Sequence, residues 1–456
     1  MITAERTGLT DILAMSKGGI DNVITMTTTN YAEPGFRFVV NIQIANMYGG
    51  VTSTDLYITQ NPQKRGILNL RSILINAVNN QTYNPAVIWK YVHNWKLYGS
   101  TPPSILAFKN YINSEVLINI WEGYEVGGVW TFNPETLSPV TFNLMAHHGW
   151  TNAFDFSIIN SANEQSLGYS DFTETTFYQR LASKVPAAFR NDAILVPTYR
   201  SQYGVLNFNA DDGTYYTQQT ANNQYVKISF YQANGTLIST NDTSYTIKVE
   251  EGKVSFVPLH AGSINYHIGL PANTAFYVAT LKDINDDICS PEILFYIEDA
   301  DCKNDPINIA WIGKKGGWNY YNFIKTNQNS IDIERTEYKR PFGDYANLGL
   351  GSETPGQLKN DWRDNRQYVS RENMVTKYLT ITSDWITEKE FEYLESLMVA
   401  DVVHWVPDYQ IEYIPMIITD NSYIMRRERN STKYNLTLKL KYAQDYQAIN
   451  YNSIGA

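Results

Sequence analysis

The chain has 456 residues, enough for two to four domains, and 43% of them are hydrophobic, as in folded proteins. Charged residues reach only 18%, and the formal net charge of −10 argues against binding to a phosphate backbone, which needs clustered Lys and Arg. The two cysteines, Cys289 and Cys302, provide neither a disulfide framework nor a four-ligand zinc site.

Aromatic residues make up 14% of the chain, with 34 Tyr and 10 Trp. Tyr favours strands and interfaces, because its ring is apolar and its hydroxyl needs a partner. A surface poor in charge and rich in Tyr and Asn suits broad, permanent protein contacts, although any Tyr-rich, all-β surface has the same composition. The opening residues 1–6 lack the apolar stretch of a secretory signal, and no run approaches ~18 apolar residues. We therefore expect synthesis in a reducing cytoplasm and no membrane span.

The N-terminal part is expected to be β-rich. Residues 1–20 are small, polar and Gly-containing, which predicts an N-terminal arm, and residues 21–205 are predicted to form one or more β-rich domains. Alternating residues over 36–44 are typical of a half-buried strand. Apolar residues fall at helical intervals over 67–79, which predicts a short amphipathic helix there. Other strands are expected at 23–29, 56–58, 87–91, 105–108, 116–121 and 129–132, and a helix is compatible with 172–182.

Residues 206–300 are predicted to form an immunoglobulin-like β-sandwich. Alternation is clear over 225–231, and the Asn234-Gly235 pair that follows is the strongest short-range hairpin signal. Short strands at even spacing are the signature of a sandwich. The strands expected after the hairpin are 245–249, 254–257, 264–268, 276–281 and 293–297.

Residues 301–456 are predicted to form a C-terminal β domain with one helix near 387–400. Thr387 and Glu390 have the spacing of a capping box at the start of that helix. Residues 339–376 carry many charges and glycines with little periodicity, and we expect a long ordered arm that lies on a neighbouring subunit. Strands are expected at 307–312, 377–381, 411–418, 422–427 and 436–442. The predicted fold class is therefore mainly β, with multidomain β-sandwich or barrel units and a few short helices.

The chain shows no arrangement of residues that is typical of catalysis. None of its six His lies in an HExxH spacing, and the adjacent His147 and His148 would point to opposite faces of a strand. There is no GxSxG motif and no phosphate-binding loop. We predict that the chain is not an enzyme and has no catalytic, cofactor-binding or metal-binding residues.

Two functions directed at glycans stay open at this point. Exposed Trp121, Trp130 and Trp150 would suit a sugar-binding platform of an adhesin or fibre protein of a virion or cell surface, whereas Trp residues in strands are more often core. A pair of carboxylates facing each other across a groove would suit a glycan-cleaving depolymerase.

The C-terminal unit carries the motifs of a resemblance. They are Cys302, Ile309-Ala310-Trp311-Ile312, Gly316-Gly317-Trp318-Asn319-Tyr320-Tyr321-Asn322-Phe323, Arg335-Thr336-Glu337-Tyr338, the helix around Glu390–Leu397, Ile411–Ile418 and Arg426-Arg427. Together these motifs resemble virion structural proteins of tailed phages that infect Bacteroidetes, crAss-like phages included. The N-terminal layout, in which Asn61-Pro62 and Gly66 lead to a helix, is similar in kind. The resemblance covers about two-thirds of the chain and is strongest after residue 300.

The resemblance implies a ring-forming tail or neck protein, close to the portal and part of the tail barrel, that assembles in the host bacterial cytoplasm. Its partners would be copies of itself and neighbouring tail or neck proteins. DNA would pass through the ring without specific binding, because an acidic wall repels phosphate. The residues expected to mediate assembly are Trp318, Tyr320, Tyr321, Arg335, Tyr338, Arg340, Trp362, Arg363 and Arg366.

Overall fold

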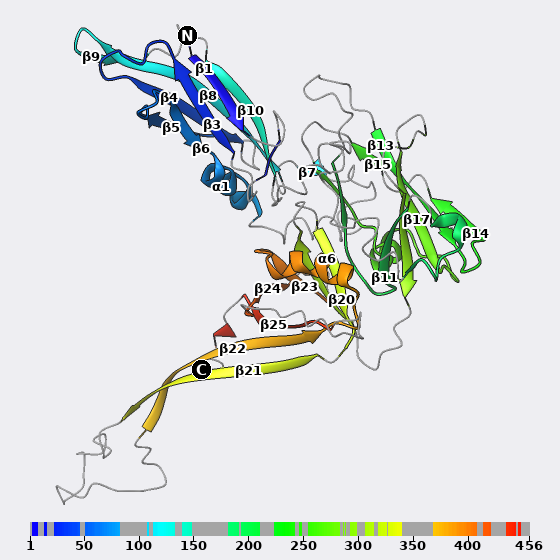
Figure 1. Ribbon diagram of the computed structural model, residues 1–456. Coiled ribbons are helices and arrows are strands. Elements are labelled where there is room, and N and C mark those ends of the chain that lie inside the picture. Colours follow the sequence, from blue (N-terminus) through cyan, green and yellow to red (C-terminus); the bar gives the residue numbers. More distant parts are fainter. Residues whose placement is uncertain are drawn as a thin grey trace, which may run out of the picture.

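The computed structural model describes residues 2–7, 13–15, 22–45, 51–82, 107–108, 113–132, 139–147, 181–190, 193–209, 223–241, 246–248, 254–282, 286, 288, 292–298, 306–313, 318–325, 327–339, 368–407, 414–420, 435–443 and 446–447. Strands dominate these residues and the helices are short (Figure 1). This confirms the predicted mainly β fold with sandwich- or barrel-like units.

The N-terminal unit contains two sheets. The smaller has the strand order β1 (Ile2–Thr7), β3 (Val23–Thr28) and β6 (Gly66–Asn69). The larger has the order β2 (Leu13–Met15), β10 (Val140–His147), β8 (Asn113–Val126), β4 (Arg37–Ala45) and β5 (Val51–Ile58), and β9 (Val129–Thr131) pairs with β8. The two sheets enclose one core, which contains Phe38, Val40 and Ile118 of the larger sheet.

The prediction of an arm at residues 1–20 is wrong for the segments that the structure describes. Residues 2–7 pair with β3 in an antiparallel register, and residues 13–15 pair with β10 in a parallel one. Ile2 and Ala4 pack against the N-terminal core. Backbone pairing and this apolar contact hold the first residues of the chain in its own fold.

Helix α1 spans Arg71–Thr82, so it begins later than the prediction of 67–79. The preceding residues form β6, whose side chains alternate between buried and exposed and whose backbone pairs with β3. Apolar residues over 67–74 fit both a strand and a helix, and the available backbone partner decides between them. The Asn69 side-chain oxygen accepts a hydrogen bond from the Arg71 amide at 2.9 Å, and this bond marks the start of the helix.

The middle unit is a sandwich of two sheets. One has the order β11 (Ala193–Tyr199), β18 (Glu292–Glu298), β17 (Phe276–Lys282), β13 (Asn223–Tyr231) and β14 (Leu237–Asn241), with β15 (Thr246–Lys248) also on β13. The other has the order β12 (Leu206–Asn209), β16 (Val254–Val257) and β7 (Ala107–Phe108). The sandwich therefore takes strands from outside the predicted range of 206–300, because β11 pairs in parallel with β18 and β7 pairs with β16.

The predicted hairpin at Asn234-Gly235 is confirmed. It joins β13 to β14, and Gly235 has a φ of +85°, which a glycine adopts without strain. The Gln232 amide donates to the Thr236 carbonyl at 2.9 Å and closes the turn. The turn chemistry alone was sufficient to place this connection.

The strand predicted at 264–268 is wrong, because these residues belong to helix α5 (Ala261–His267). Ile264 is buried, and the Gly262 amide donates to the Gln202 carbonyl at 2.9 Å. A Cβ atom on Gly262 would lie 2.8 Å from that carbonyl oxygen, so only glycine lets the helix approach this backbone. A one-residue alternation over so short a segment does not separate a strand from a buried helix. The short helix η3 (Ala187–Phe189) lies before β11.

The C-terminal unit is one antiparallel sheet with a helix. Its strand order is β20 (Trp318–Phe323), β19 (Ile307–Ile312), β23 (Val403–Val406), β24 (Ile414–Ile418), β25 (Thr437–Tyr442), β22 (Tyr368–Thr382) and β21 (Gln328–Lys339), and β26 (Tyr446–Gln447) pairs with β22. Helix α6 (Glu388–Met398) packs Leu394 and Leu397 into the core. The middle sandwich and this sheet share that core.

The predicted arm at 339–376 is in part a strand. Lys339 ends β21, and residues 368–376 form the first part of β22, which pairs with β21 along its length. Residues 340–367 lie outside the described residues. The predicted strands at 87–91 and 422–427, and residues 172–180 of the predicted helix, also lie outside them.

The capping box at the start of α6 is present as predicted, and it yields a stability prediction. The Thr387 hydroxyl accepts from the Glu390 amide at 3.3 Å, and the Glu390 carboxylate accepts from the Thr387 amide at 2.8 Å. Thr387→Ala should lower the free energy of unfolding by about 1 kcal/mol, measured by urea denaturation. Thr387→Ser keeps the acceptor and should stay near the parent value. Equal losses in the two variants would contradict the role of the cap.

Candidate assembly surface

Strands β21 and β22 form a two-stranded ribbon that extends away from the rest of the molecule (Figure 1). Residues 331–337 of β21 are all exposed, and the sheet order places β21 at an edge. A β-bulge interrupts the pairing at Thr336 and Glu337. A long edge strand offers a row of backbone donors and acceptors to another chain, so this ribbon is the candidate surface for assembly.

The two faces of the ribbon differ in chemistry. Side chains directly opposed in an antiparallel pair lie on the same face, so Ile331 lies with Lys377 and Ile333 lies with Val375. We call the side with Ile331, Ile333 and Val375 the apolar face. It continues the face that Leu379 buries in the core, yet Ile331 is 57% exposed and Ile333 is 48% exposed. Asp332 and Glu334 point to the opposite side, which we call the acidic face.

The structure places Trp318, Tyr320 and Tyr321 in the core of the chain, so their predicted role in contacts between subunits is wrong. Their side chains are only 4%, 3% and 8% exposed. The aromatic run forms β20. Tyr321 belongs to the core shared with the sandwich, the Tyr320 ring packs on His260, and the Trp318 ring packs on His404 of β23, all within the same chain. The sequence showed that these rings need a partner surface, but it did not show that the partner is intramolecular.

Hydrogen bonds at this junction explain the burial of the aromatic run. The Tyr320 hydroxyl accepts from the Val205 amide at 3.0 Å, and the Tyr320 amide donates to the Tyr393 hydroxyl at 3.2 Å. The Asn322 side-chain amide donates to Gln202 at 2.6 Å. Strand β20 is therefore bonded both to the sandwich and to α6, and the two units act as one packed body.

The other predicted assembly residues belong to the ribbon or lie outside the described residues. Arg335 is exposed on β21, next to Ile333 and Glu334. Tyr338 lies in the same strand. Arg340, Trp362, Arg363 and Arg366 lie outside the described residues. Sequence reasoning missed Ile331 and Ile333, although their alternation with Asp332 and Glu334 is the ordinary signal of an amphipathic strand.

Carboxylates gather at one cavity, but each already has a structural partner. The cavity, of about 40 Å³, is lined by Glu298, Asp384 and Glu390 among others. Glu298 pairs with Lys184 at 3.0 Å, Asp384 pairs with Lys325 at 3.1 Å, and Glu390 caps α6. A space of this size holds water and not a sugar ring. Among the described residues, no group of His, Cys, Asp and Glu has the geometry of a metal site.

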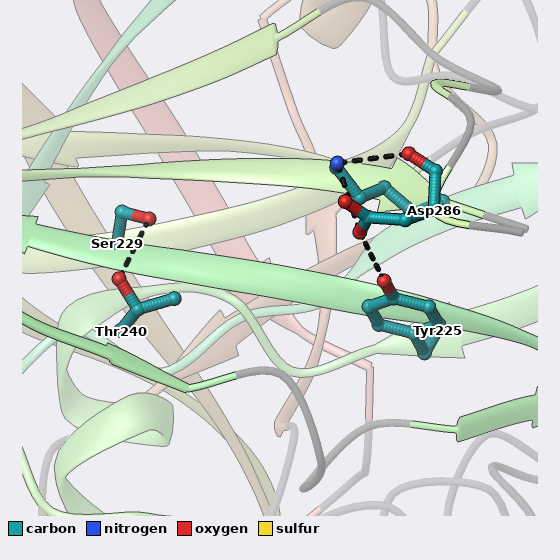
Figure 2. Close-up of polar contacts among 5 residues, drawn as sticks. Tyr225, Ser229, Thr240 and Asp286 are labelled. Atoms are coloured by element: carbon teal, nitrogen blue, oxygen red, sulfur yellow. Dashed lines mark hydrogen bonds and ion pairs between the residues drawn. The ribbon is translucent and has the colours of Figure 1, made fainter.

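Tyr225 and Asp286 form an exposed polar contact between β13 and the connection after β17 (Figure 2). The Tyr225 hydroxyl donates to the Asp286 carboxylate, and the Lys282 ammonium lies 2.9 Å from the same carboxylate. The hydrogen bond from Tyr225 and then that from Lys282 lower the pKa of Asp286. Asp286 has a φ of +70°, and these bonds hold it in that conformation. The geometry fits a loop anchor.

Two histidines, His260 and His404, are buried in the chain. Burial lowers the pKa of His260 to about 3 and that of His404 to about 4, because the surroundings disfavour the charged ring. The His260 ring lies between Phe295 and Tyr320, and its Nδ1 is 3.4 Å from the Thr198 hydroxyl. A Cβ atom on Gly204 would lie 2.4 Å from the His260 ring, so the junction has no spare room there.

Of the tryptophans considered for a sugar platform, Trp121 and Trp130 lie near each other on the N-terminal unit, and Trp150 lies outside the described residues. Trp130 packs edge-on against Tyr57, with planes at 74°, and Trp121 packs edge-on against Phe132, at 73°. The indole nitrogens of both Trp are buried. These described rings do not form the coplanar platform that the hypothesis requires.

No protein-family description matches this chain, and no curated protein matches it significantly. Among the described residues, there is no helix with the length and hydropathy needed to cross a membrane. The resemblance to phage virion proteins therefore stays a prediction.

The Tyr320 hydroxyl gives a prediction for the junction. Tyr320→Phe should lower the free energy of unfolding by about 1–3 kcal/mol, because the buried Val205 amide loses its acceptor. Urea denaturation followed by tryptophan fluorescence measures this loss. Tyr296→Phe changes a partly exposed Tyr of the middle sandwich and should cost less than about 0.5 kcal/mol. A Tyr320→Phe variant as stable as the parent would show that the junction does not depend on this bond.

The buried histidines predict a loss of stability in acid. The pKa of each ring is lower in the folded chain than the ordinary value of 6.5. As the pH falls below this value, the rings become protonated in the unfolded chain but not in the folded chain, and this protonation favours unfolding. Each histidine should remove about 2 kcal/mol between pH 7 and pH 5, a loss that starts below about pH 6.5. Urea midpoints at the two pH values measure it. His260→Gln should flatten the dependence, and an unchanged slope would contradict the assignment.

Proposed function

We propose that this chain is a non-enzymatic structural protein that assembles with copies of itself, and that the assembly is a ring in the tail or neck of a tailed-phage virion. The observation that carries the self-assembly part is the ribbon of β21 and β22, which exposes apolar side chains along an edge strand. The motif resemblance supports the phage part, and with it assembly in a bacterial cytoplasm beside other tail or neck proteins.

The apolar face of the ribbon is the proposed contact to a second copy. Ile331 and Ile333 lie two residues apart on one side of a strand, so a neighbouring subunit can cover both at once. Arg335 and Lys377 lie beside them on the same side and suit an acidic partner. A second copy of the chain is such a partner, because its net charge is −10. In a ring this contact is heterologous, with a different surface of the neighbour receiving the ribbon.

The acidic face of the ribbon suits a conduit for DNA. Asp332 and Glu334 are exposed on the side away from the apolar face. Negative side chains repel phosphate, so a lumen that they line lets DNA pass without binding. The middle sandwich, with the strand order β11, β18, β17, β13 and β14 in one sheet, supports the proposed immunoglobulin-like unit, because many cell-surface domains share a sandwich architecture.

The experiment compares two double variants that change opposite faces of the same ribbon. Ile331→Thr with Ile333→Thr keeps β-branched side chains but removes apolar contact area, worth about 2 kcal/mol at each interface. We expect the dissociation constant for assembly to rise about thirtyfold. Mass photometry measures the particle mass over a concentration series, and electron microscopy shows whether closed rings form.

Asp332→Thr with Glu334→Thr is the matched control. It should leave assembly near the parent level and should increase retention on double-stranded DNA at low salt, because two repulsive charges are removed. A parent chain that stays monomeric at all concentrations, or an Ile331/Ile333 variant that assembles as well as the parent, would overturn the proposal.

A further inference from the structure

The larger N-terminal sheet has one face opposite the core, which we call the outer face. Side chains at opposed positions of β5, β4, β8 and β10 form rows across it. Asp55, Asn41, Asn119 and Thr141 make one such row, which we call the polar row. The core residues of this unit, such as Phe38, Val40 and Ile118, belong to the other face of the same strands.

Hydrogen bonds hold the polar row in a fixed geometry. The Asn41 side-chain amide donates to Asp55 at 2.6 Å and to Ser53 at 2.8 Å, and its oxygen accepts from Gln43 at 3.0 Å. The Thr141 hydroxyl donates to the Asn119 side-chain oxygen at 2.9 Å. The side chains are therefore oriented before any ligand arrives, which reduces the entropy that binding would cost.

The polar row keeps unused hydrogen-bonding capacity. Within the described part of the chain, the Asn119 side-chain nitrogen makes no hydrogen bond, and the second carboxylate oxygen of Asp55 accepts none. Asp55 and Thr141 are exposed. Three spacings between neighbouring strands give the row a length of about 14 Å, which matches a short oligosaccharide.

A row of apolar and aromatic side chains, which we call the aromatic row, lies beside the polar row. Tyr57, Val39 and Trp121 form this adjacent row. Val39 is fully buried and Trp121 is partly buried, whereas Tyr57 is 53% exposed, so Tyr57 is the ring of this row that a ligand can reach. Trp130 supports the Tyr57 ring edge-on at 5.6 Å between centroids, and Trp130 itself packs so closely on Gly123 that a Cβ there would lie 2.5 Å from its ring. The Tyr57 ring thus has a fixed position and an open side.

We propose that the outer face binds a neutral oligosaccharide. A sugar ring offers hydroxyl groups to amides and carboxylates and a C–H surface to an aromatic ring, and the outer face presents these groups side by side. Asp55 is the only charged side chain in the polar row and in the aromatic row beside it, which disfavours acidic sugars and nucleic acid. One face of a sheet contacts a ligand from one side only, so we expect one chain to bind weakly and an assembly of copies to bind more tightly through multivalency.

The test uses the full chain on an array of immobilised neutral and acidic oligosaccharides, followed by solution titration of the neutral oligosaccharide that binds best. Asp55→Ala and Asn119→Ala should each reduce the affinity at least tenfold, and Tyr57→Ala should do the same. Thr54→Ala is the matched control, because Thr54 is the exposed neighbour in β5 that points away from the outer face, and it should bind as the parent does. Circular dichroism and thermal unfolding check that each variant is folded.

Several outcomes would overturn the proposal. The parent chain could bind no neutral oligosaccharide, or it could prefer acidic ones. The Asp55 and Asn119 variants could bind as tightly as the parent. The outer face could bind another protein and no oligosaccharide. If an alanine variant does not fold, Asp55→Asn preserves the size of the side chain and supplies the same comparison. Failure here leaves the assembly proposal intact, because particle mass is measured independently of glycan binding.

Discussion

The packing of β20 between the middle sandwich and helix α6 is the constraint on which the larger part of the structure depends. The Tyr320 hydroxyl accepts a hydrogen bond from the Val205 amide of the sandwich. The Tyr393 hydroxyl of the helix accepts from the Tyr320 amide and donates to the Tyr320 carbonyl. Trp311 is fully buried beside it and donates to Ser396 at 2.9 Å. Because the same core continues through both units, neither sheet can shift without exposing apolar surface.

The ribbon is joined to this shared core, which suits it to bear a contact with another subunit. Strand β22 begins in the ribbon and ends in the sheet, where Leu379 and Ile381 are buried. Ile331 and Ile333 lie on β21, which pairs with β22 along its length, so a contact at either side chain is supported by a strand that is anchored in the core. The N-terminal unit has a core of its own, and its outer face carries polar and aromatic rows that the core does not use. Assembly and ligand recognition are thus proposed for separate surfaces.

Much of the fold followed from local patterns. The mainly β class, the Asn234-Gly235 hairpin and the capped helix at Thr387 depend on side chains near in sequence, and the structure contains all three. Errors arose where a segment fits two structures. Residues 264–268 alternate like a strand, but the close approach of Gly262 to Gln202 places them in a helix. Residues 2–7 looked like an arm, but β3 offered their backbone a partner.

The sequence by itself determined the mainly β class, the hairpin turn, the helix cap and the low proportion of charged residues, because turn chemistry, capping and composition are local properties. Only the tertiary structure decided where the aromatic run points. The sequence pattern of Trp318, Tyr320 and Tyr321 is the same whether these side chains contact another subunit or pack inside their own chain. Their burial depends on strands that are distant in the sequence. The same holds for Ile331 and Ile333, since the exposure of an amphipathic strand depends on whether a neighbour covers it, and in this chain the described residues leave both exposed.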